Sequence, residues 1–279
     1  MPFRTIQFPS GQDVPVLGQG TWHFAEDPSR RKDEIAALRK GLDLGMTVVD
    51  TAEMYADGAA EELVGEAIAG RGDQVFLVSK VLPNHASRRG IVAACEQSLR
   101  RLGTDRIDLY LLHWRESVPL HETLDGFETL AQAGKIRYWG VSNFDIQDME
   151  ELTRVAHGQD CAANQVVYNL ARRGIEWDLL PWCSDRKLPL MAYSPIEQGT
   201  LSKNKGLKAV AVRHGATPAQ VALAWVLRRK GIIAIPKAGA PEHVLENHGA
   251  LDLTLSDQDL GELDRLFPPP TSKKPLEII

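Results

Sequence analysis

Two kinds of apolar segment alternate along the chain. Nearly continuous apolar runs of strand length occupy residues 75–78, 107–112, 188–192 and 232–235. Shorter runs of the same kind lie at 47–49, 138–141 and 165–167, with a weaker one at 18–22. Continuous rather than alternating hydrophobicity is typical of strands covered on both faces, as in a parallel sheet. We therefore expect eight buried, parallel strands.

Between these runs, apolar residues recur every three or four positions, which is the spacing of one helix face. Ile35, Leu38 and Leu42 form one such face, and similar faces occur within 91–102, 120–130, 146–155 and 221–227. The first three of these five segments are followed by Gly45, Gly103 and Gly134. Glycine at this position indicates a helix end because it tolerates the left-handed conformation.

Strand and helix alternate about eight times without a break in composition, so we expect one α/β domain over residues 1–279. Two architectures compete: a closed (β/α)8 TIM barrel and an open doubly wound sheet. The open sheet usually carries GxGxxG after its first strand, whereas residues 18–23 lack the third glycine. We expect the barrel. Residues 5–16 alternate like a β-hairpin around Ser10 and Gly11, and we expect this hairpin to cap the barrel's bottom.

The charge balance argues against several classes of partner. Acidic residues outnumber basic ones by 37 to 32, for a formal net charge of −5. The chain has no basic surplus to neutralise phosphates, so we expect no nucleic-acid partner and no anionic-membrane binding. No apolar stretch approaches the ~18 residues of a membrane helix, and residues 1–10 contain no apolar secretory segment. Three cysteines without CxxC spacing fit a reducing compartment. We therefore expect a cytoplasmic protein.

Polar side chains follow the predicted strands, at the ends where a barrel collects its chemistry. They include Asp50, Tyr55, Lys80, His113, Ser142, Asn143, Gln165, Tyr193, Ser194 and Lys237. Taken singly, a lysine after a strand is usually a solvated loop residue, and a lone histidine is more often structural than catalytic. Their occurrence on successive strand ends predicts convergence on a common pocket.

Six motifs occur in a fixed order: Asp50-Thr51-Ala52-Glu53-Met54-Tyr55, Leu112-His113-Trp114, Gly140-Val141-Ser142-Asn143-Phe144, Asn164-Gln165, Tyr193-Ser194-Pro195 and Ile235-Pro236-Lys237. With them the chain resembles the aldo-keto reductase family over essentially its whole length. It is most similar to the short bacterial members that reduce methylglyoxal and other small aldehydes. The resemblance implies a (β/α)8 barrel that binds NADP(H) in extended form without a Rossmann domain, in agreement with the missing GxGxxG.

The resemblance implies four catalytic residues: Tyr55 as general acid, Lys80 as the cation beside it, Asp50 as the partner of Lys80, and His113 as a hydrogen-bond donor to the substrate oxygen. An ordinary tyrosine has a pKa of about 10 and is a reluctant acid at neutral pH. An ammonium about 4 Å away stabilises the phenolate by roughly 4 kcal/mol at an effective dielectric of ~20. That attraction could lower the tyrosine pKa by up to ~3 units before desolvation opposes it.

For the cofactor, the resemblance implies that Tyr193 stacks on the nicotinamide and that Ser142, Asn143 and Gln165 bind its carboxamide. Ser194 and Ile196 would lie along the pyrophosphate. Lys237 and His243 would face the 2′-phosphate end, with Glu246 and Asn247 at the adenine. Two positions depart from the family pattern, since Ala238 replaces a common serine and His243 a common arginine. A histidine is mostly neutral at pH 7 and lacks the guanidinium fork, so we expect a weaker preference for NADPH over NADH.

Trp22 and Trp114 are expected to wall an apolar substrate pocket. Only about ten residues separate Pro195 from the next helical segment, and the chain after Pro270 is short. We therefore expect an open, shallow pocket that takes small reactive carbonyls. The partner expected for this chain is a small-molecule carbonyl substrate, and the expected assembly is a monomer or a weak oligomer.

Three alternatives compete with a reductase. One is a sugar or alcohol dehydrogenase that works oxidatively with the same four catalytic groups. Another is a redox-sensing or partner-binding protein that holds the cofactor with little turnover, although the intact catalytic set argues against it. The third is a metal hydrolase. No HxH or HExxH spacing occurs among the eight histidines, and we expect no metal.

Overall fold

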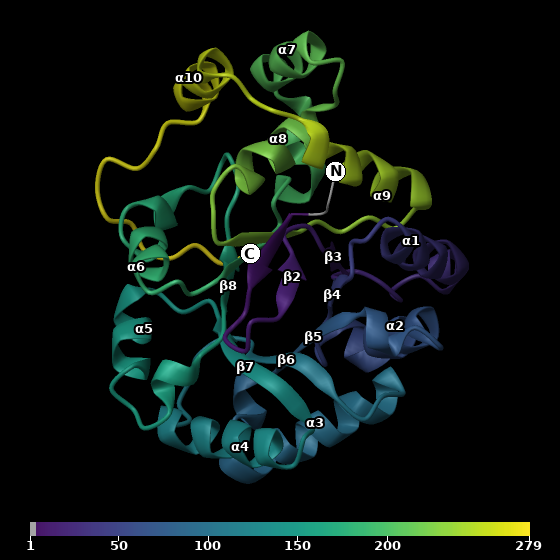
Figure 1. Ribbon diagram of the computed structural model, residues 1–279, viewed down its shortest axis with the longest axis vertical. Coiled ribbons are helices and arrows are strands. Elements are labelled where there is room, and N and C mark those ends of the chain that lie inside the picture. Colours follow the sequence, from purple (N-terminus) through teal and green to yellow (C-terminus); the bar gives the residue numbers. More distant parts are fainter. Residues whose placement is uncertain (1–3) are drawn as a thin grey trace.

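Eight parallel strands form a ring at the centre of the computed structural model, which describes residues 4–279 (Figure 1). The first three residues of the expected domain lie outside the described part. Neighbouring strands pair in chain order: β3 (Gln19–Gly20), β4 (Val48–Asp50), β5 (Phe76–Val81), β6 (Ile107–Leu112), β7 (Ile136–Ser142), β8 (Asn164–Val167), β9 (Leu190–Tyr193) and β10 (Ile232–Ile235). Parallel bridges from Leu17 to Ala234 and from Gly20 to Lys237 close the ring. The predicted barrel is confirmed, although its weakest expected strand shrinks to two residues.

Helices surround the ring of strands (Figure 1). Their bounds are α1 (Arg31–Asp43), α2 (Ala59–Ile68), α3 (Arg88–Leu102), α4 (Leu120–Gln132), α5 (Ile146–Leu152), α6 (Leu179–Asp185), α7 (Lys205–Arg213), α8 (Pro218–Leu227), α9 (Pro241–His248) and α10 (Asp257–Leu266). The five helical faces expected from the sequence lie on α1, α3, α4, α5 and α8. None of the helices within residues 4–279 is both long and apolar enough to span a bilayer.

Alternation of side chains explains why the strand sequences are continuously apolar. Along β5, Phe76 and Val78 pack inside the barrel, whereas Leu77 packs between the barrel and the helices. Both faces of each strand are therefore buried, and every second residue belongs to the interior. The same alternation points a polar side chain into the barrel when the residue occupies an inward position near the carboxyl-terminal end of a strand.

The predicted hairpin is also confirmed. Strands β1 (Thr5–Gln7) and β2 (Asp13–Pro15) pair antiparallel, and in Figure 1 they cross the centre of the ring. Phe8 lies in the connection between them, with its ring centroid 5.0 Å from that of Phe76 and 5.4 Å from that of Tyr138. Because Phe76 is the first residue of β5, the hairpin closes the amino-terminal end of the barrel. The opposite end stays available for chemistry.

Candidate active site

Three ionisable residues enter the barrel at its carboxyl-terminal end by strand parity. Asp50 is two positions beyond the inward Val48 of β4 and is the last residue of that strand. Lys80 continues the inward row of Phe76 and Val78 on β5, and His113 follows β6 directly. Successive parallel strands therefore bring a carboxylate, an ammonium and an imidazole to one layer above the apolar barrel core.

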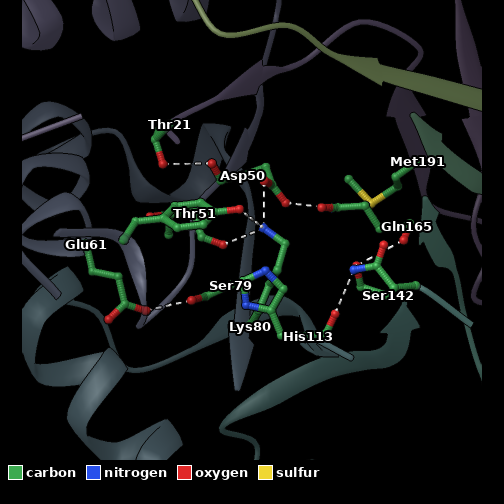
Figure 2. Close-up of polar contacts among 12 residues, drawn as sticks. Thr21, Asp50, Thr51, Glu61, Ser79, Lys80, His113, Ser142, Gln165 and Met191 are labelled. Carbon is green, nitrogen blue, oxygen red and sulfur yellow. Dashed lines mark hydrogen bonds and ion pairs between the residues drawn. The ribbon is translucent and has the colours of Figure 1, made fainter. Parts of the chain in front are cut away.

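Lys80 is fully buried and its ammonium is saturated with hydrogen bonds. Its side chain is 0% exposed, and Nζ donates to Oδ2 of Asp50 at 2.8 Å and to the carbonyl oxygen of Thr51 at 2.9 Å. The third donor reaches the hydroxyl of Tyr55 at 3.2 Å. Figure 2 shows Lys80 between Asp50 and Thr51. Three acceptors for three N–H groups fix the position of the ammonium.

Asp50 is held on both of its carboxylate oxygens. Oδ2 accepts from Lys80, and Oδ1 accepts from Nε2 of Gln165 at 2.7 Å. The carboxylate is nearly inaccessible, because only 4% of the Asp50 side chain is exposed. The sequence analysis assigns Gln165 to the nicotinamide carboxamide. One of its amide hydrogens binds Asp50, and the side chain also lines the cavity, with other hydrogen-bonding groups on its amide.

Tyr55 is presented by a sharp backbone turn after β4. It begins a short 3-10 segment in which Ala56 and Asp57 have φ of +49° and +52°, followed by Gly58 at +91°. Left-handed conformations at non-glycine residues are costly and tend to mark functional sites. The turn brings the Tyr55 ring to 4.9 Å from Nζ of Lys80 and to 5.9 Å from the His113 ring, centroid to centroid.

The protonation states follow from burial and the charges nearby. Desolvation raises the pKa of the Tyr55 phenol, and the Lys80 ammonium offsets part of that rise. The expected lowering by Lys80 is thus real, but it is outweighed by burial. For Lys80, burial disfavours the ammonium, yet Asp50 and Tyr55 outweigh it and raise the pKa. Tyr55 is consequently a neutral phenol and Lys80 a cation at neutral pH.

His113 is held neutral. Burial lowers its pKa to about 3, and the Lys80 charge contributes to the same direction. The residue is 8% exposed, and its Nδ1 has no hydrogen-bond partner within residues 4–279. A neutral imidazole keeps one N–H to donate and one nitrogen to accept. His113 therefore faces the cavity as an uncharged donor, next to a phenol that is also a donor.

A second set of polar residues, at the ends of strands β7 to β9, lines the cavity. The hydroxyl of Ser142 donates to the carbonyl oxygen of Gln165 at 2.9 Å. Asn143, with φ of +59°, donates to the carbonyl oxygen of His113 at 3.1 Å, and its Oδ1 accepts from the Tyr193 hydroxyl at 2.9 Å. Burial raises the pKa of Tyr193 to about 12. These contacts fix the Tyr193 ring as a flat wall of the cavity.

The remaining expected cofactor residues line the same cavity, beyond strands β9 and β10. They are Ser194, Ile196, Lys237, His243, Glu246 and Asn247, together with Ala238 at the departing position. Asn169, which the sequence analysis does not single out, donates to the carbonyl oxygen of Ser194 at 2.9 Å and to Glu197 at 2.6 Å. It is fully buried and positions the loop that carries Ser194 and Ile196.

Asp50, Tyr55, His113 and the expected cofactor residues line one cavity of about 650 Å³ at the carboxyl-terminal end of the barrel, whereas Lys80 and Asn169 lie behind its wall. Trp22 and Trp114 line it as expected, but Ile278 and Ile279 line it as well. The chain after α10 passes α6 and returns toward the centre of the barrel (Figure 1). The carboxyl-terminal segment thus covers part of the cavity mouth, which the sequence analysis does not anticipate, although Ile278 itself remains 60% exposed.

Arg30 is the clearest omission of the sequence analysis. It ends the short 3-10 helix Pro28–Arg30 before α1 and lines the cavity near Lys237 and Gly239. The available signal was its position: the connection after β3 belongs to the same end of the barrel as the other strand ends.

Comparison with known proteins identifies the class. Residues 16–267 match the model of the aldo/keto reductase family. The chain therefore belongs to the aldo/keto reductase family and is an oxidoreductase. It is 50% identical to methylglyoxal reductase YeaE of Escherichia coli K12, with 100% of each chain covered. It is 33% identical to glyoxal reductase of Bacillus subtilis, over 94% of this chain and 92% of that protein.

Solved structures give the same result. An aldo-keto reductase from Klebsiella pneumoniae, crystallised in complex with NADPH, is 52% identical and superposes with a TM-score of 0.97 over 100% of both chains. A second structure of an aldo/keto reductase from Klebsiella pneumoniae, in complex with NADP and acetate, also has a TM-score of 0.97, over 99% of this chain and 100% of that one. The barrel, the hairpin and the family expected from the sequence are thus confirmed.

Proposed function

We propose that this chain reduces small aldehydes and ketones of the methylglyoxal type to alcohols, with NADPH as the cofactor and Tyr55 as the general acid. The single observation that carries the proposal is the contact between the buried Lys80 ammonium and the Tyr55 hydroxyl at 3.2 Å. The family membership, the similarity to a methylglyoxal reductase and the similarity to NADPH-bound structures support the same activity.

The residues of the cavity fit a bound dinucleotide. When bound, NADPH supplies the hydride that carbonyl reduction requires. Tyr193 offers a fixed aromatic face, while Ser142, Asn143 and Gln165 offer amide and hydroxyl groups beside it. Lys237 and Arg30 supply positive charge elsewhere in the cavity. Flat aromatic, polar and cationic surfaces of this kind match a nicotinamide ring, its carboxamide and phosphate groups.

Tyr55 supplies the proton. Because desolvation raises its pKa, the phenol holds its hydrogen at neutral pH until a stronger base forms beside it. An alkoxide that develops on the substrate oxygen is such a base. As the phenol releases its proton, the phenolate that remains is stabilised by the ammonium of Lys80, in a dry site where that attraction is strong.

Asp50 and His113 support the proton transfer from Tyr55 to the substrate oxygen, one on each side. Asp50 is a positioning residue, since it holds the Lys80 ammonium at 2.8 Å and keeps it charged despite its burial. His113, as a neutral imidazole, donates a hydrogen bond to the carbonyl oxygen of the substrate. This bond orients the oxygen toward the Tyr55 hydroxyl. Removing one such donor typically costs about 10²- to 10³-fold in rate.

Substrate size is limited by the walls of the cavity. Trp22 and Trp114 provide apolar surface, and Ile278 and Ile279 add a further apolar edge. Small, reactive carbonyls fit beside these walls without displacing the carboxyl-terminal segment.

NADPH consumption with methylglyoxal, measured beside alcohol oxidation with NADP⁺, tests the proposal. We expect the reduction to be the faster direction at neutral pH, and Tyr55→Phe to remove most turnover while cofactor affinity changes little. Faster oxidation of sugars or alcohols would support the dehydrogenase instead. Tight NADPH binding with no turnover across a panel of aldehydes would support a cofactor-binding sensor.

A further inference from the structure

Arg30 and Lys237 extend their cationic ends toward the same point of the cavity wall. A Cβ built on Gly239 would lie 2.7 Å from Nη2 of Arg30 and 3.5 Å from Nζ of Lys237. Since both distances start at the same point, the two nitrogen atoms are no more than about 6 Å apart. The missing side chain of Gly239 makes room for the Arg30 guanidinium, while Lys237 Nζ lies at ordinary contact distance.

No carboxylate neutralises this pair directly. Within residues 4–279, neither the Arg30 nor the Lys237 side chain forms an ion pair within 4.0 Å or a hydrogen bond. The carboxylates whose charge acts on Lys237 are those of Glu34 and Glu26. Glu34 accepts from the backbone nitrogen of Ala25 at 3.0 Å, and Glu26 faces His23 at 2.7 Å. Burial lowers the pKa of Lys237, and the charge of Arg30 lowers it further.

Ala238 and His243, which are expected near the 2′-phosphate, cannot bind it as two cations would. Ala238 has no hydroxyl to donate. His243 is exposed on α9, with its Nδ1 3.5 Å from Oε2 of Glu246. Glu246 in turn accepts from the hydroxyl of Thr217 at 2.6 Å. His243 therefore faces a carboxylate and offers no fixed charged fork.

We propose that Arg30 and Lys237 form a two-cation clamp for the 2′-phosphate of NADPH, and that Arg30 makes the chain select NADPH over NADH. The inference rests on the proposed use of NADPH and adds Arg30 as the residue that distinguishes NADPH from NADH by binding the 2′-phosphate. A phosphomonoester carries up to two negative charges and several acceptor oxygens, and a guanidinium binds two of them at once. Arg30 reaches the site from the connection between β3 and α1, and not from the segment after β10 that supplies Lys237, Ala238 and His243.

The clamp predicts the opposite of one expectation of the sequence analysis. Ala238 and His243 predict a weak preference for NADPH, because each removes a phosphate ligand of the family pattern. Arg30 supplies both what Ala238 lacks, a hydrogen-bond donor, and what His243 lacks, a permanent charge. The preference for NADPH is therefore strong despite the two departures.

Binding measurements without turnover test the clamp. Quenching of intrinsic fluorescence gives the Kd of NADPH and of NADH for wild type, Arg30→Gln and the control Arg31→Gln. Arg31 is the next residue, and its guanidinium pairs with Glu66 at 2.8 Å, away from the cavity. We expect Arg30→Gln to weaken NADPH at least tenfold and NADH less than twofold, and Arg31→Gln to change neither. Competition by 2′,5′-ADP and by 5′-AMP should show the same difference.

Gly239→Ala provides a second variant that keeps Arg30 in the chain. Its new methyl group would occupy the space now filled by the guanidinium, so NADPH should weaken by a smaller factor than in Arg30→Gln. Circular dichroism checks that each variant is folded. An Arg30→Gln protein that loses NADPH and NADH affinity equally would overturn the clamp, because Arg30 would then contact a part that both cofactors share. Unchanged NADPH affinity would overturn it too.

The wild-type titration separates this inference from the proposed function. A wild type with no affinity for NADPH would overturn the proposed function. Tight wild-type binding that Arg30→Gln leaves intact would overturn the clamp alone.

Discussion

At the scale of single residues, the site depends on one buried ammonium. Lys80 has no exposed side-chain surface, and it bonds to a carboxylate, a carbonyl and a phenol. Burying a charge in this way is costly unless its partners are fixed. Gln165 supplies that fixation by holding the second oxygen of Asp50. Chemistry and stability are therefore coupled at this pair.

Breaking the pair should destabilise the protein more than removing it. Lys80→Met leaves Asp50 buried without its cation, and we expect the free energy of unfolding to fall by about 3–5 kcal/mol. The double variant Asp50→Asn with Lys80→Met should recover most of this loss without recovering activity. Urea unfolding and kcat/KM measure the two effects. A double variant less stable than Lys80→Met would contradict the account.

The His113 imidazole makes stability depend on pH. Its pKa in the folded protein is about 3, against roughly 6.5 in an unfolded chain. Between these values the unfolded state binds the extra proton. Stability from His113 is therefore complete above pH ~6.5 and is lost as the pH falls toward 3, by up to about 1.4 kcal/mol per pH unit. Urea unfolding of wild type and His113→Asn at several pH values measures this component. The difference in unfolding free energy between the two should shrink on acidification, and parallel curves would show that His113 is not held neutral.

At the scale of elements, strand parity explains which polar residues meet. On several strands the inward row is apolar near the amino-terminal end of the barrel and polar near the carboxyl-terminal end, as in Val48 to Asp50 on β4 or Met191 to Tyr193 on β9. This arrangement can be read from the sequence, because neighbouring parallel strands share one carboxyl-terminal edge. The turn at Tyr55 is less accessible to such reasoning, since two non-glycine residues adopt left-handed backbone there.

The carboxyl-terminal segment is a different case. Its path depends on long-range contacts: Arg172 contacts Glu277 at 2.9 Å and Glu197 at 2.9 Å, and the Ile279 backbone bonds to Tyr193. No periodicity in the sequence encodes such contacts, so the sequence analysis, which considers only that the chain after Pro270 is short, does not place this segment at the cavity. Arg30 was missed for a related reason, since its role depends on its distance to Gly239 and not on any pattern around it.

Loosening this segment should broaden substrate choice. Glu277→Gln removes one contact of Arg172 and leaves its contact with Glu197 intact. We expect stability to fall by no more than about 1 kcal/mol, since the pair is partly exposed, while kcat/KM for bulky aromatic aldehydes rises relative to methylglyoxal. Lys273→Gln is the matched control, because it removes another ion pair of the same segment, with Asp178. Identical substrate ratios in wild type and both variants would show that the segment does not restrict the cavity.

At the scale of the whole molecule, the barrel separates stability from chemistry. The hairpin and the apolar interior rows fill the amino-terminal end, and nearly every titratable group of the site lies at the other end. The alternation of strands and helices predicts an α/β domain, and the missing third glycine of GxGxxG favours the barrel over the open sheet. The sequence analysis assigns no helical face to α2, α6, α9 and α10, and two of these, α6 and α9, have only 7 and 8 residues, which leaves little room for a periodic signal.

The central claim is that the Tyr55 phenol and the Lys80 ammonium act as one unit, and a double-mutant cycle tests it most directly. The rate of NADPH oxidation in a single turnover with methylglyoxal is measured for wild type, Tyr55→Phe, Lys80→Met and the double variant. Each single change should slow the reaction by about 10²-fold or more, and the double variant should be little slower than Tyr55→Phe alone. Losses that multiply in the double variant would show that the two groups act independently.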